Sequence, residues 1–265
     1  MSKITPITIT NRRRAVFIGI NYTQSSSNRL AGCANDVKKM VSYMSGKKFD
    51  SVVLSDDIAS KPEKTIKWPT RKNILNAIDW AIKDMKAGDE AFIHYSGHGG
   101  LTVDLSGDEV SGKDSCIYPI SETGTIEYIT DDELRVLVVD RIPEGAKCTV
   151  VFDCCHSGTC LDMRYGYKPI SDTSIILSEN SKYPKGKGLV VFISGCTDVQ
   201  TAADTVDINN IPSGALTNAI FEVLKTENKM KRFLWAVLKE LSVKGYSQVP
   251  QLSSSIPFQL SDPFI

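Results

Sequence analysis

The stretch Val150-Val151-Phe152-Asp153-Cys154-Cys155-His156-Ser157-Gly158 indicates the fold class. Its first residues continue an apolar run from Cys148, which is typical of a buried strand. A second strand-like run, Ala91 to Ile93, breaks into His94-Tyr95-Ser96-Gly97-His98-Gly99-Gly100. The carboxyl ends of parallel strands share one edge of a sheet, where ligands bind. We therefore expect a cysteine from one strand end and a histidine from the other to lie close together.

Strand-like and helix-like segments alternate along the whole chain. Further strands are predicted at 15–20, 51–54 and 189–193, with a last short strand within 249–258. Helices are predicted after Asp36, after the capping residue Thr70, from Thr130 to Val139, and over 215–225 and 233–244. The alternation predicts an α/β sandwich around a mostly parallel sheet, in one domain spanning residues 1–265. Residues 1–13 are expected to be flexible or an edge segment, and residues 161–187 show weak periodicity with a flexible loop at 182–188.

Composition excludes several classes of protein. Lysine and arginine number 31 and aspartate and glutamate also 31, so no global charge points to nucleic acid or an anionic membrane. No apolar run approaches the roughly 18 residues of a membrane helix, and the start lacks a signal-peptide pattern. Seven cysteines, two of them adjacent, do not suggest a disulfide framework. We expect a soluble cytoplasmic protein with reduced thiols and no nucleic-acid or membrane partner.

The residues at the two strand ends suit nucleophilic catalysis. A thiol attacks as its thiolate, and a nearby imidazole can take its proton and return it to the leaving group. The amides of Gly99 and Cys155 are placed to donate to a developing oxyanion. A structural cysteine is commoner than a catalytic one, so the pairing gains weight from its position at both strand ends.

The motifs His94-Tyr95-Ser96-Gly97-His98-Gly99 and Asp153-Cys154-Cys155-His156-Ser157-Gly158 resemble the two catalytic signatures of metacaspases, which are caspase-like cysteine peptidases. The resemblance runs from about Ala15 to the C-terminus. It implies a caspase-type fold, His98 as base, Cys155 as nucleophile, and cleavage after Arg or Lys. It is nearest to the type I members, here without a long N-terminal prodomain. Cys154 departs from many relatives, which have a small residue there, and leaves open which thiol reacts.

Asp153 allows an independent argument. A carboxylate two residues before the nucleophile opposes thiolate formation, because a nearby like charge raises a pKa. Asp153 therefore suits the binding of a cationic side chain rather than activation of the thiol. The resemblance places Cys33, Asp36 and Ser96 with Asp153 in the pocket for the P1 residue. The alternative for Asp36 is a helix cap.

The acidic stretches between residues 104 and 133 have two interpretations. They can be solvated, or they can favour a helix start through the dipole. The metacaspase resemblance instead implies a calcium site on Asp114, Asp131 and Asp132. Calcium prefers about 6 to 8 oxygen ligands, and no linear EF-hand motif is present.

The sequence thus predicts a monomeric, calcium-stimulated cysteine endopeptidase that acts on peptides and proteins with Arg or Lys at P1. Two alternatives remain: a catalytically silent caspase-fold binding protein, and a thiol redox sensor using Cys154 and Cys155. Self-cleavage at Lys182, Lys185 or Lys187 is a further hypothesis, which follows from the P1 preference.

Overall fold

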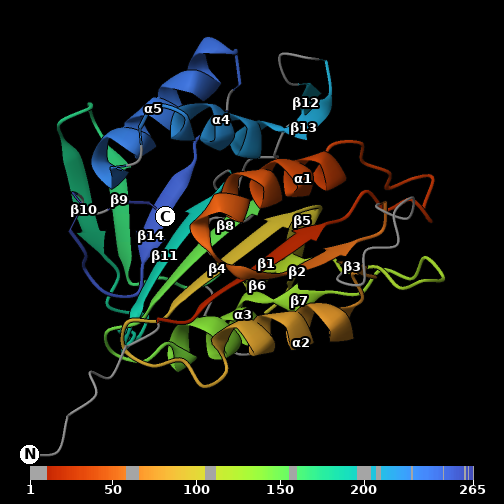
Figure 1. Ribbon diagram of the computed structural model, residues 1–265, viewed down its shortest axis with the longest axis horizontal. Coiled ribbons are helices and arrows are strands. Elements are labelled where there is room, and N and C mark those ends of the chain that lie inside the picture. Colours follow the sequence, from red (N-terminus) through yellow and green to blue (C-terminus); the bar gives the residue numbers. More distant parts are fainter. Residues whose placement is uncertain are drawn as a thin grey trace, which may run out of the picture.

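The computed structural model describes residues 11–57, 66–104, 112–154, 160–195, 204–206, 210–227, 229–246, 248–259, 261 and 263–264. Its centre is a nine-stranded sheet with the order β10-β9-β14-β11-β8-β4-β1-β2-β3. Six neighbouring strands, from β11 to β3, are parallel (Figure 1). In chain order these six are β1 (Arg13–Gly19), β2 (Asp50–Ser55), β3 (Ile66–Lys67), β4 (Glu90–Ser96), β8 (Lys147–Asp153) and β11 (Leu189–Ser194).

The remaining three strands extend one side of the sheet in antiparallel fashion. They are β14 (Gln251–Ser254), β9 (Tyr165–Pro169) and β10 (Ile175–Glu179). The last strand, predicted within 249–258, is confirmed, and it lies inside the sheet between β11 and β9. The β9–β10 hairpin was not predicted. Four of the five residues of β10 are exposed, so no buried face imposes the alternation from which a strand is recognised.

Helices cover both faces of the sheet (Figure 1). One layer holds α2 (Arg71–Ile82) and α3 (Asp131–Val138), which continues into the short 3₁₀ turn η2 (Val139–Arg141). The other layer holds α1 (Cys33–Met44), with its 3₁₀ extension η1 (Ser45–Lys47), and the two later helices. These are α4 (Ala215–Leu224) and α5 (Met230–Val243).

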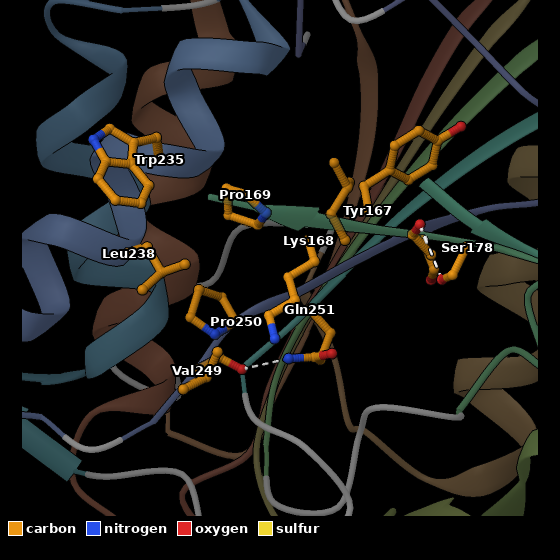
Figure 2. A pocket seen from close by; sticks show the side chains of 12 residues that line it. Tyr167, Lys168, Pro169, Ser178, Trp235, Leu238, Val249, Pro250 and Gln251 are labelled. Carbon is orange, nitrogen blue, oxygen red and sulfur yellow. Dashed lines mark hydrogen bonds between the residues drawn. The ribbon is translucent and has the colours of Figure 1, made fainter. Parts of the chain in front are cut away.

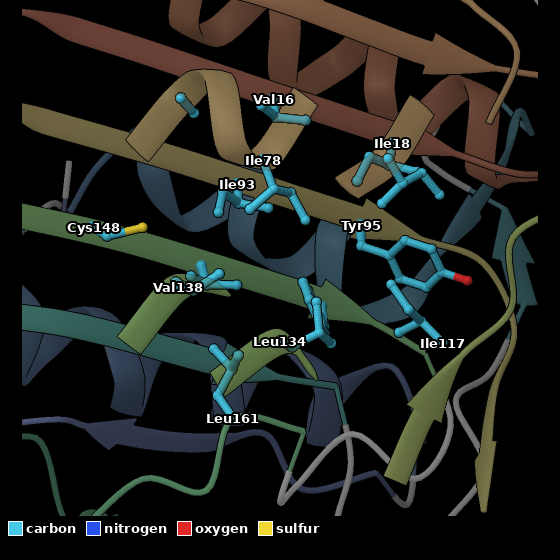
Figure 3. Close-up of a cluster of buried hydrophobic side chains, with 14 of the residues drawn as sticks. Val16, Ile18, Ile78, Ile93, Tyr95, Ile117, Leu134, Val138, Cys148 and Leu161 are labelled. Atoms are coloured by element: carbon cyan, nitrogen blue, oxygen red, sulfur yellow. The ribbon is translucent and has the colours of Figure 1, made fainter. Parts of the chain in front are cut away.

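Each face of the sheet has its own core, because successive strand side chains point to opposite faces. In β1, Val16 and Ile18 pack with the α2 and α3 side, whereas Ala15 and Phe17 pack with the α1, α4 and α5 side. Figure 3 shows the first of these cores, in which Ile78 of α2 and Leu134 of α3 face the strands. The central strands are therefore buried on both faces, which explains their continuous apolar runs.

Two predicted helix starts are confirmed in detail. The Thr70 hydroxyl accepts from the backbone N–H of Asn73, 3.1 Å away. At α3, Thr130 and Glu133 cap each other's backbone N–H groups in a capping box.

The prediction that residues up to 13 form a flexible or edge segment is wrong for its last residue. Arg13 begins β1, which has β2 on one side and β4 on the other. The Arg13 guanidinium lies 2.8 Å from the Glu90 carboxylate, and the backbone N–H of Arg12 donates to Asp89. Residues 1–10 lie outside the described residues.

Two small sheets flank the main one. β5 (Gly99–Val103), β6 (Lys113–Ile117) and β7 (Ile129–Thr130) form an antiparallel sheet that starts directly after the end of β4. β12 (Asp204–Val206) pairs with β13 (Pro212–Gly214), which leads into α4. Both small sheets therefore extend from the edge where β4 and β8 end.

Candidate active site

The two motif-bearing strands, β4 and β8, are parallel neighbours in the sheet. Their last residues, Ser96 and Asp153, are register partners. His98 follows β4 by two residues, and Cys155 follows β8 by two residues in the sequence. The sequence prediction that both ends share one edge is confirmed for the strands. Cys155 and its neighbours up to Thr159, including His156, lie outside the described residues.

The half-buried imidazole of His98 is held in one orientation. Its Nε2 lies 2.8 Å from the carbonyl oxygen of Asn28, and its ring packs on Tyr22 with centroids 4.6 Å apart. A carbonyl only accepts, so this bond assigns the proton of the neutral ring to Nε2 and leaves Nδ1 as the acceptor. The backbone of His98 is fixed as well: its N–H donates to the Tyr22 hydroxyl, and its carbonyl accepts from the Tyr95 hydroxyl.

Tyr22 and Tyr95 form a neutral scaffold beneath His98. Burial raises the pKa of both hydroxyls above the ordinary range, so both keep their protons. The Tyr22 hydroxyl donates to the Tyr118 carbonyl at 2.7 Å while it accepts from His98. Neither tyrosine was singled out by the sequence. Their aromatic character gives no sign of the hydrogen bonds, which depend on the loop after β4 folding back over them.

Asp36 is fully buried and lies in the first turn of α1, three residues after the helix begins. One carboxylate oxygen accepts from the Ser96 hydroxyl at 2.7 Å, and the other accepts from the Ser213 hydroxyl at 2.5 Å. The backbone N–H of Gly214 donates to the same carboxylate at 2.9 Å. The alternative that Asp36 caps α1 is wrong, because its oxygens bind groups from other elements and α1 has no side-chain cap.

Asp153 reaches the same place from the end of β8. It is buried, and its Oδ2 accepts from the backbone N–H of Thr217 at 2.7 Å. A Cβ on Gly214 would lie 2.2 Å from Oδ2 of Asp153 and 2.9 Å from Oδ2 of Asp36. The two carboxylates therefore meet at the amino end of α4, where the helix dipole favours negative charge. Burial first, and the charge of Asp153 second, raise the pKa of Asp36 above its usual value.

The four predicted pocket residues are thus placed at one edge. Asp36, Ser96 and Asp153 surround a common point, and Cys33 is the first residue of α1, with its backbone N–H donating to Asn21. All four are buried. Gly99, the predicted oxyanion donor, opens β5 beside Ile117. The groups that donate to the two carboxylates therefore cover them.

Sequence reasoning missed Ser213, Gly214 and Thr217, which bind the two acids. Ser213 is 177 residues from Asp36 and Thr217 is 64 residues from Asp153, so nothing local pairs them. The available signal was weak: a Ser-Gly pair directly before an apolar helical stretch is a pattern found at helix starts.

Of the predicted calcium ligands, Asp131 and Asp114 lie near each other and Asp132 faces elsewhere. Asp131 is buried at the start of α3, and its carboxylate accepts from the backbone N–H groups of Ser115 and Asp132. Burial, then the charge of Asp162, and to a smaller extent that of Asp114, raise the pKa of Asp131 to about 8. The carboxylate of Asp132 instead lines a groove between α2 and α3.

Asp162 was not predicted from the sequence. It is buried and has a positive φ of 44°, a backbone conformation that is uncommon for residues other than glycine. No short motif marks such a residue. Across the described residues, no group of three or more His, Cys, Asp or Glu side chains is arranged to hold a metal ion. The structure therefore supplies a buried acidic neighbourhood, with oxygen ligands of the kind calcium prefers, but not a closed coordination shell.

His94 is a buried core residue. It lies within β4, not in the following loop, and its Nε2 is 3.1 Å from the Thr217 hydroxyl. Burial lowers the pKa of His94 to about 3, so the ring is neutral. His94 thus ties β4 to the same helix end that holds the two acids.

Comparisons with known proteins identify the family. A family model described as "Metacaspase, peptidase C14 domain" matches residues 13–164. Metacaspase-1 of Meyerozyma guilliermondii is 34% identical over 305 residues, covering 96% of this chain and 72% of that relative. Metacaspase-1 of Schizosaccharomyces pombe is 34% identical over 303 residues, covering 96% of this chain and 70% of that relative.

A solved structure agrees with the fold. A protein from Geobacter sulfurreducens superposes with a TM-score of 0.69 over 95% of this chain and 97% of that one, at 23% sequence identity. The expected caspase-like α/β sandwich with a mostly parallel sheet is confirmed. No helix in the described part of the chain is long and apolar enough to cross a membrane. The family model matches more than half of the sequence, and the two relatives are 34% identical over 96% of this chain. These matches show that the chain belongs to the metacaspase family of cysteine peptidases.

Proposed function

We propose that the protein is a calcium-stimulated cysteine endopeptidase that cleaves after Arg or Lys. The observation that carries the proposal is the meeting of Asp36 and Asp153 at the amino end of α4, directly where the His98-bearing and Cys155-bearing strands end. Two buried carboxylates at that edge favour a cationic side chain beside the scissile bond.

In the proposed reaction, Nδ1 of His98 takes the proton of the Cys155 thiol, because Nε2 is committed to the Asn28 carbonyl. The thiolate attacks the scissile carbonyl carbon, and the oxyanion that forms accepts from the amides of Gly99 and Cys155. His98 then gives its proton to the leaving amine. Water, deprotonated by the same imidazole, hydrolyses the thioester and releases the Cys155 thiol.

The P1 side chain would be held by Asp36, Asp153, Ser96 and Cys33. A guanidinium offers five donors in a planar fork and an ammonium three, and either cation compensates one of the two carboxylate charges. The donors that occupy the acids, namely the Ser96 and Ser213 hydroxyls and the α4 amides, keep them in place before substrate arrives. Binding exchanges part of this network for the substrate cation.

Calcium is proposed to bind at Asp114, Asp131 and Asp132, with Asp162 as an added candidate. Three of these carboxylates are buried, and the charges of Asp162 and Asp114 both bear on Asp131. A divalent cation would relieve that repulsion, and carboxylate oxygens are the ligands it prefers. Because the described side chains form no ready metal site, binding would have to draw the carboxylates together. That movement, at the start of α3 and the start of β6, is the proposed activating step.

Three further properties belong to the proposal: a monomeric state, a cytoplasmic location and self-cleavage after one of Lys182, Lys185 or Lys187. These lysines are exposed and lie in an irregular segment, where a peptidase can reach the backbone. The redox alternative is disfavoured by the complete burial of Cys154, since an oxidant must reach the thiol.

The test is hydrolysis of a fluorogenic peptide with Arg at P1, with and without millimolar calcium, by wild type, Cys155→Ala and Cys154→Ala. We expect calcium-stimulated cleavage that is lost in Cys155→Ala and retained in Cys154→Ala. Loss only in Cys154→Ala would move the nucleophile by one residue. Absence of cleavage by the folded, calcium-loaded wild type would favour the silent binding protein.

A further inference from the structure

Two hollows lie at the side of the sheet farthest from β3, away from the acids of the candidate active site. Their volumes are about 690 Å³ and about 570 Å³, and they have no lining residue in common. Both are lined by the α5 region from Lys229 onward, by the β9–β10 hairpin, and by the C-terminal segment from Val249 onward. Because the same three segments line both, we call the two hollows together the docking groove, with an apolar half and a basic half.

The apolar half is shown in Figure 2. Trp235 and Leu238 project from α5 toward Pro169 of β9 and Pro250. Val249 at the rim is 40% exposed. An indole and two proline rings make a rigid apolar wall, which loses little conformational entropy when a partner binds. The volume suits one or two side chains of a peptide rather than a small ion.

The basic half lies at the amino end of α5. Lys229, Lys231 and Arg232 line it, opposite Thr173 and a single acid, Asp172. None of the three cations forms an ion pair with any of the described residues. By contrast, Lys225, just after α4, and Lys244, just after α5, are each paired with a glutamate. Among the described residues that line the basic half, three cations therefore face one acid.

Helical spacing joins the two halves. Lys231, Trp235 and Leu238 are at positions i, i+4 and i+7 and lie on one face of α5. Lys231 lines the basic half, and the other two line the apolar half. One turn of helix, about 5.4 Å, separates the cation from the indole. Exposed Lys168 of β9 adds a fourth cation beside the apolar half.

We propose that this groove is a docking site for an acidic peptide segment of a partner protein, with carboxylates at Lys229, Lys231 and Arg232 and an adjacent large apolar side chain against Trp235 and Leu238. Charge complementarity selects the occupant. Three cations that form no ion pair among the described residues attract carboxylates, and the apolar wall favours a large apolar side chain, which a free anion lacks. The proposal does not depend on the peptidase activity, because no residue of the candidate active site lines the groove.

The experiment uses the full chain carrying Cys155→Ala, so that no probe is cleaved. The probe is a fluorescein-labelled peptide of four glutamates followed by Leu-Trp-Leu, without Lys or Arg. Fluorescence anisotropy at low and high salt should show saturable binding that weakens with added NaCl. Lys231→Glu/Arg232→Glu should weaken binding at least tenfold, and Trp235→Ala should weaken it severalfold. Circular dichroism checks that each variant is folded.

The matched control is Lys67→Glu/Lys72→Glu, which changes net charge equally at the β3 side of the sheet. It should bind within about twofold of the parent at the same salt concentration. Failure of the folded parent to bind, or equal weakening by the control pair, would overturn the proposal. So would equal affinity for a probe with glutamine in place of glutamate. Displacement of the peptide by an equimolar single-stranded RNA oligonucleotide would overturn the assignment to a peptide.

Discussion

The molecule contains two buried acidic clusters that differ in how they are satisfied. In both, burial is the first cause that raises an aspartate pKa and a neighbouring carboxylate adds to it. Asp36 accepts from two serine hydroxyls and a helix-end amide, and its neighbour Asp153 accepts from another amide of α4. Asp131 accepts from the backbone N–H groups of Ser115 and Asp132 and has two acids near it.

This difference indicates which kind of ligand each cluster is suited to bind. The first is oriented by hydroxyls and a helix dipole, so its geometry is set before a ligand arrives. Such a cluster suits an organic cation whose shape must be recognised. In the second, the charges of two neighbouring acids both act on Asp131, so its carboxylates gain most from a metal ion that can be reached by small movements. The predictions below separate these two roles.

The largest effect is expected from Asp36→Asn. This change keeps the size of the side chain but removes one buried charge that the P1 cation would pair with. Truncating one partner of a buried charge pair costs about 2 to 5 kcal/mol, which corresponds to a fall in kcat/KM of roughly 30-fold or more. Calcium affinity, followed by titration calorimetry, should stay unchanged. Unaltered cleavage after Arg would remove Asp36 from the P1 pocket.

The reverse pattern is expected from Asp131→Asn. Loss of one carboxylate should weaken calcium binding by about 10- to 100-fold, the scale seen when a supporting group at a metal site is lost. Calcium-free protein should be no less stable, because a buried charge with two acidic neighbours has been removed. Titration calorimetry and urea unfolding measure the two quantities. If Asp131→Asn and Asp36→Asn weakened calcium binding equally, the two clusters would not be functionally separate.

The pH dependence of stability gives a third separation. A carboxyl group whose pKa is raised in the folded state binds its proton more tightly there than in the unfolded chain. The free energy of unfolding therefore falls as the pH rises from about 4 to 8 and Asp131 loses its proton. Below about pH 4, Asp131 causes no loss of stability. His94 has the opposite sign: its pKa is lowered to about 3, so stability falls as pH drops below its usual value of about 6.5. Between pH 6.5 and 5 this loss is about 2 kcal/mol. Over the same range protonation of Asp131 stabilises the fold by a similar amount, so the His94 contribution appears as a difference between variants. Urea unfolding should show His94→Gln gaining about 2 kcal/mol of stability relative to wild type as the pH falls from 6.5 to 5.

Much of the fold was predictable, because the central strands are buried on both faces and read as apolar runs. The strand ends then placed His98 and Asp153 at one edge without any tertiary information. The predictions failed where tertiary contacts decide. The β10 strand is exposed on both faces and has no pattern of its own. Two of the partners of Asp36, Ser213 and Gly214, come from β13, 177 and 178 residues away. Asp162 likewise raises the pKa of Asp131 from a buried position, and the surrounding sequence does not indicate that burial.

The smallest effect tests whether the order of α3 controls the second cluster. Thr130→Ala removes the hydroxyl that caps α3 immediately before Asp131, and Thr70→Ala removes the equivalent cap of α2. Each should cost about 1 kcal/mol, or a fall in Tm of about 2–4 °C by calorimetry for a chain of this size. Only Thr130→Ala should also weaken calcium binding, by a few-fold, because fraying of the first turn moves the Asp131 carboxylate and the Asp132 amide that it accepts from.

Equal stability losses with equal calcium affinities would mean that the cation site does not depend on the first turn of α3. A weaker affinity in Thr130→Ala alone would tie the proposed activation step to that turn, since general destabilisation is matched by the Thr70→Ala control.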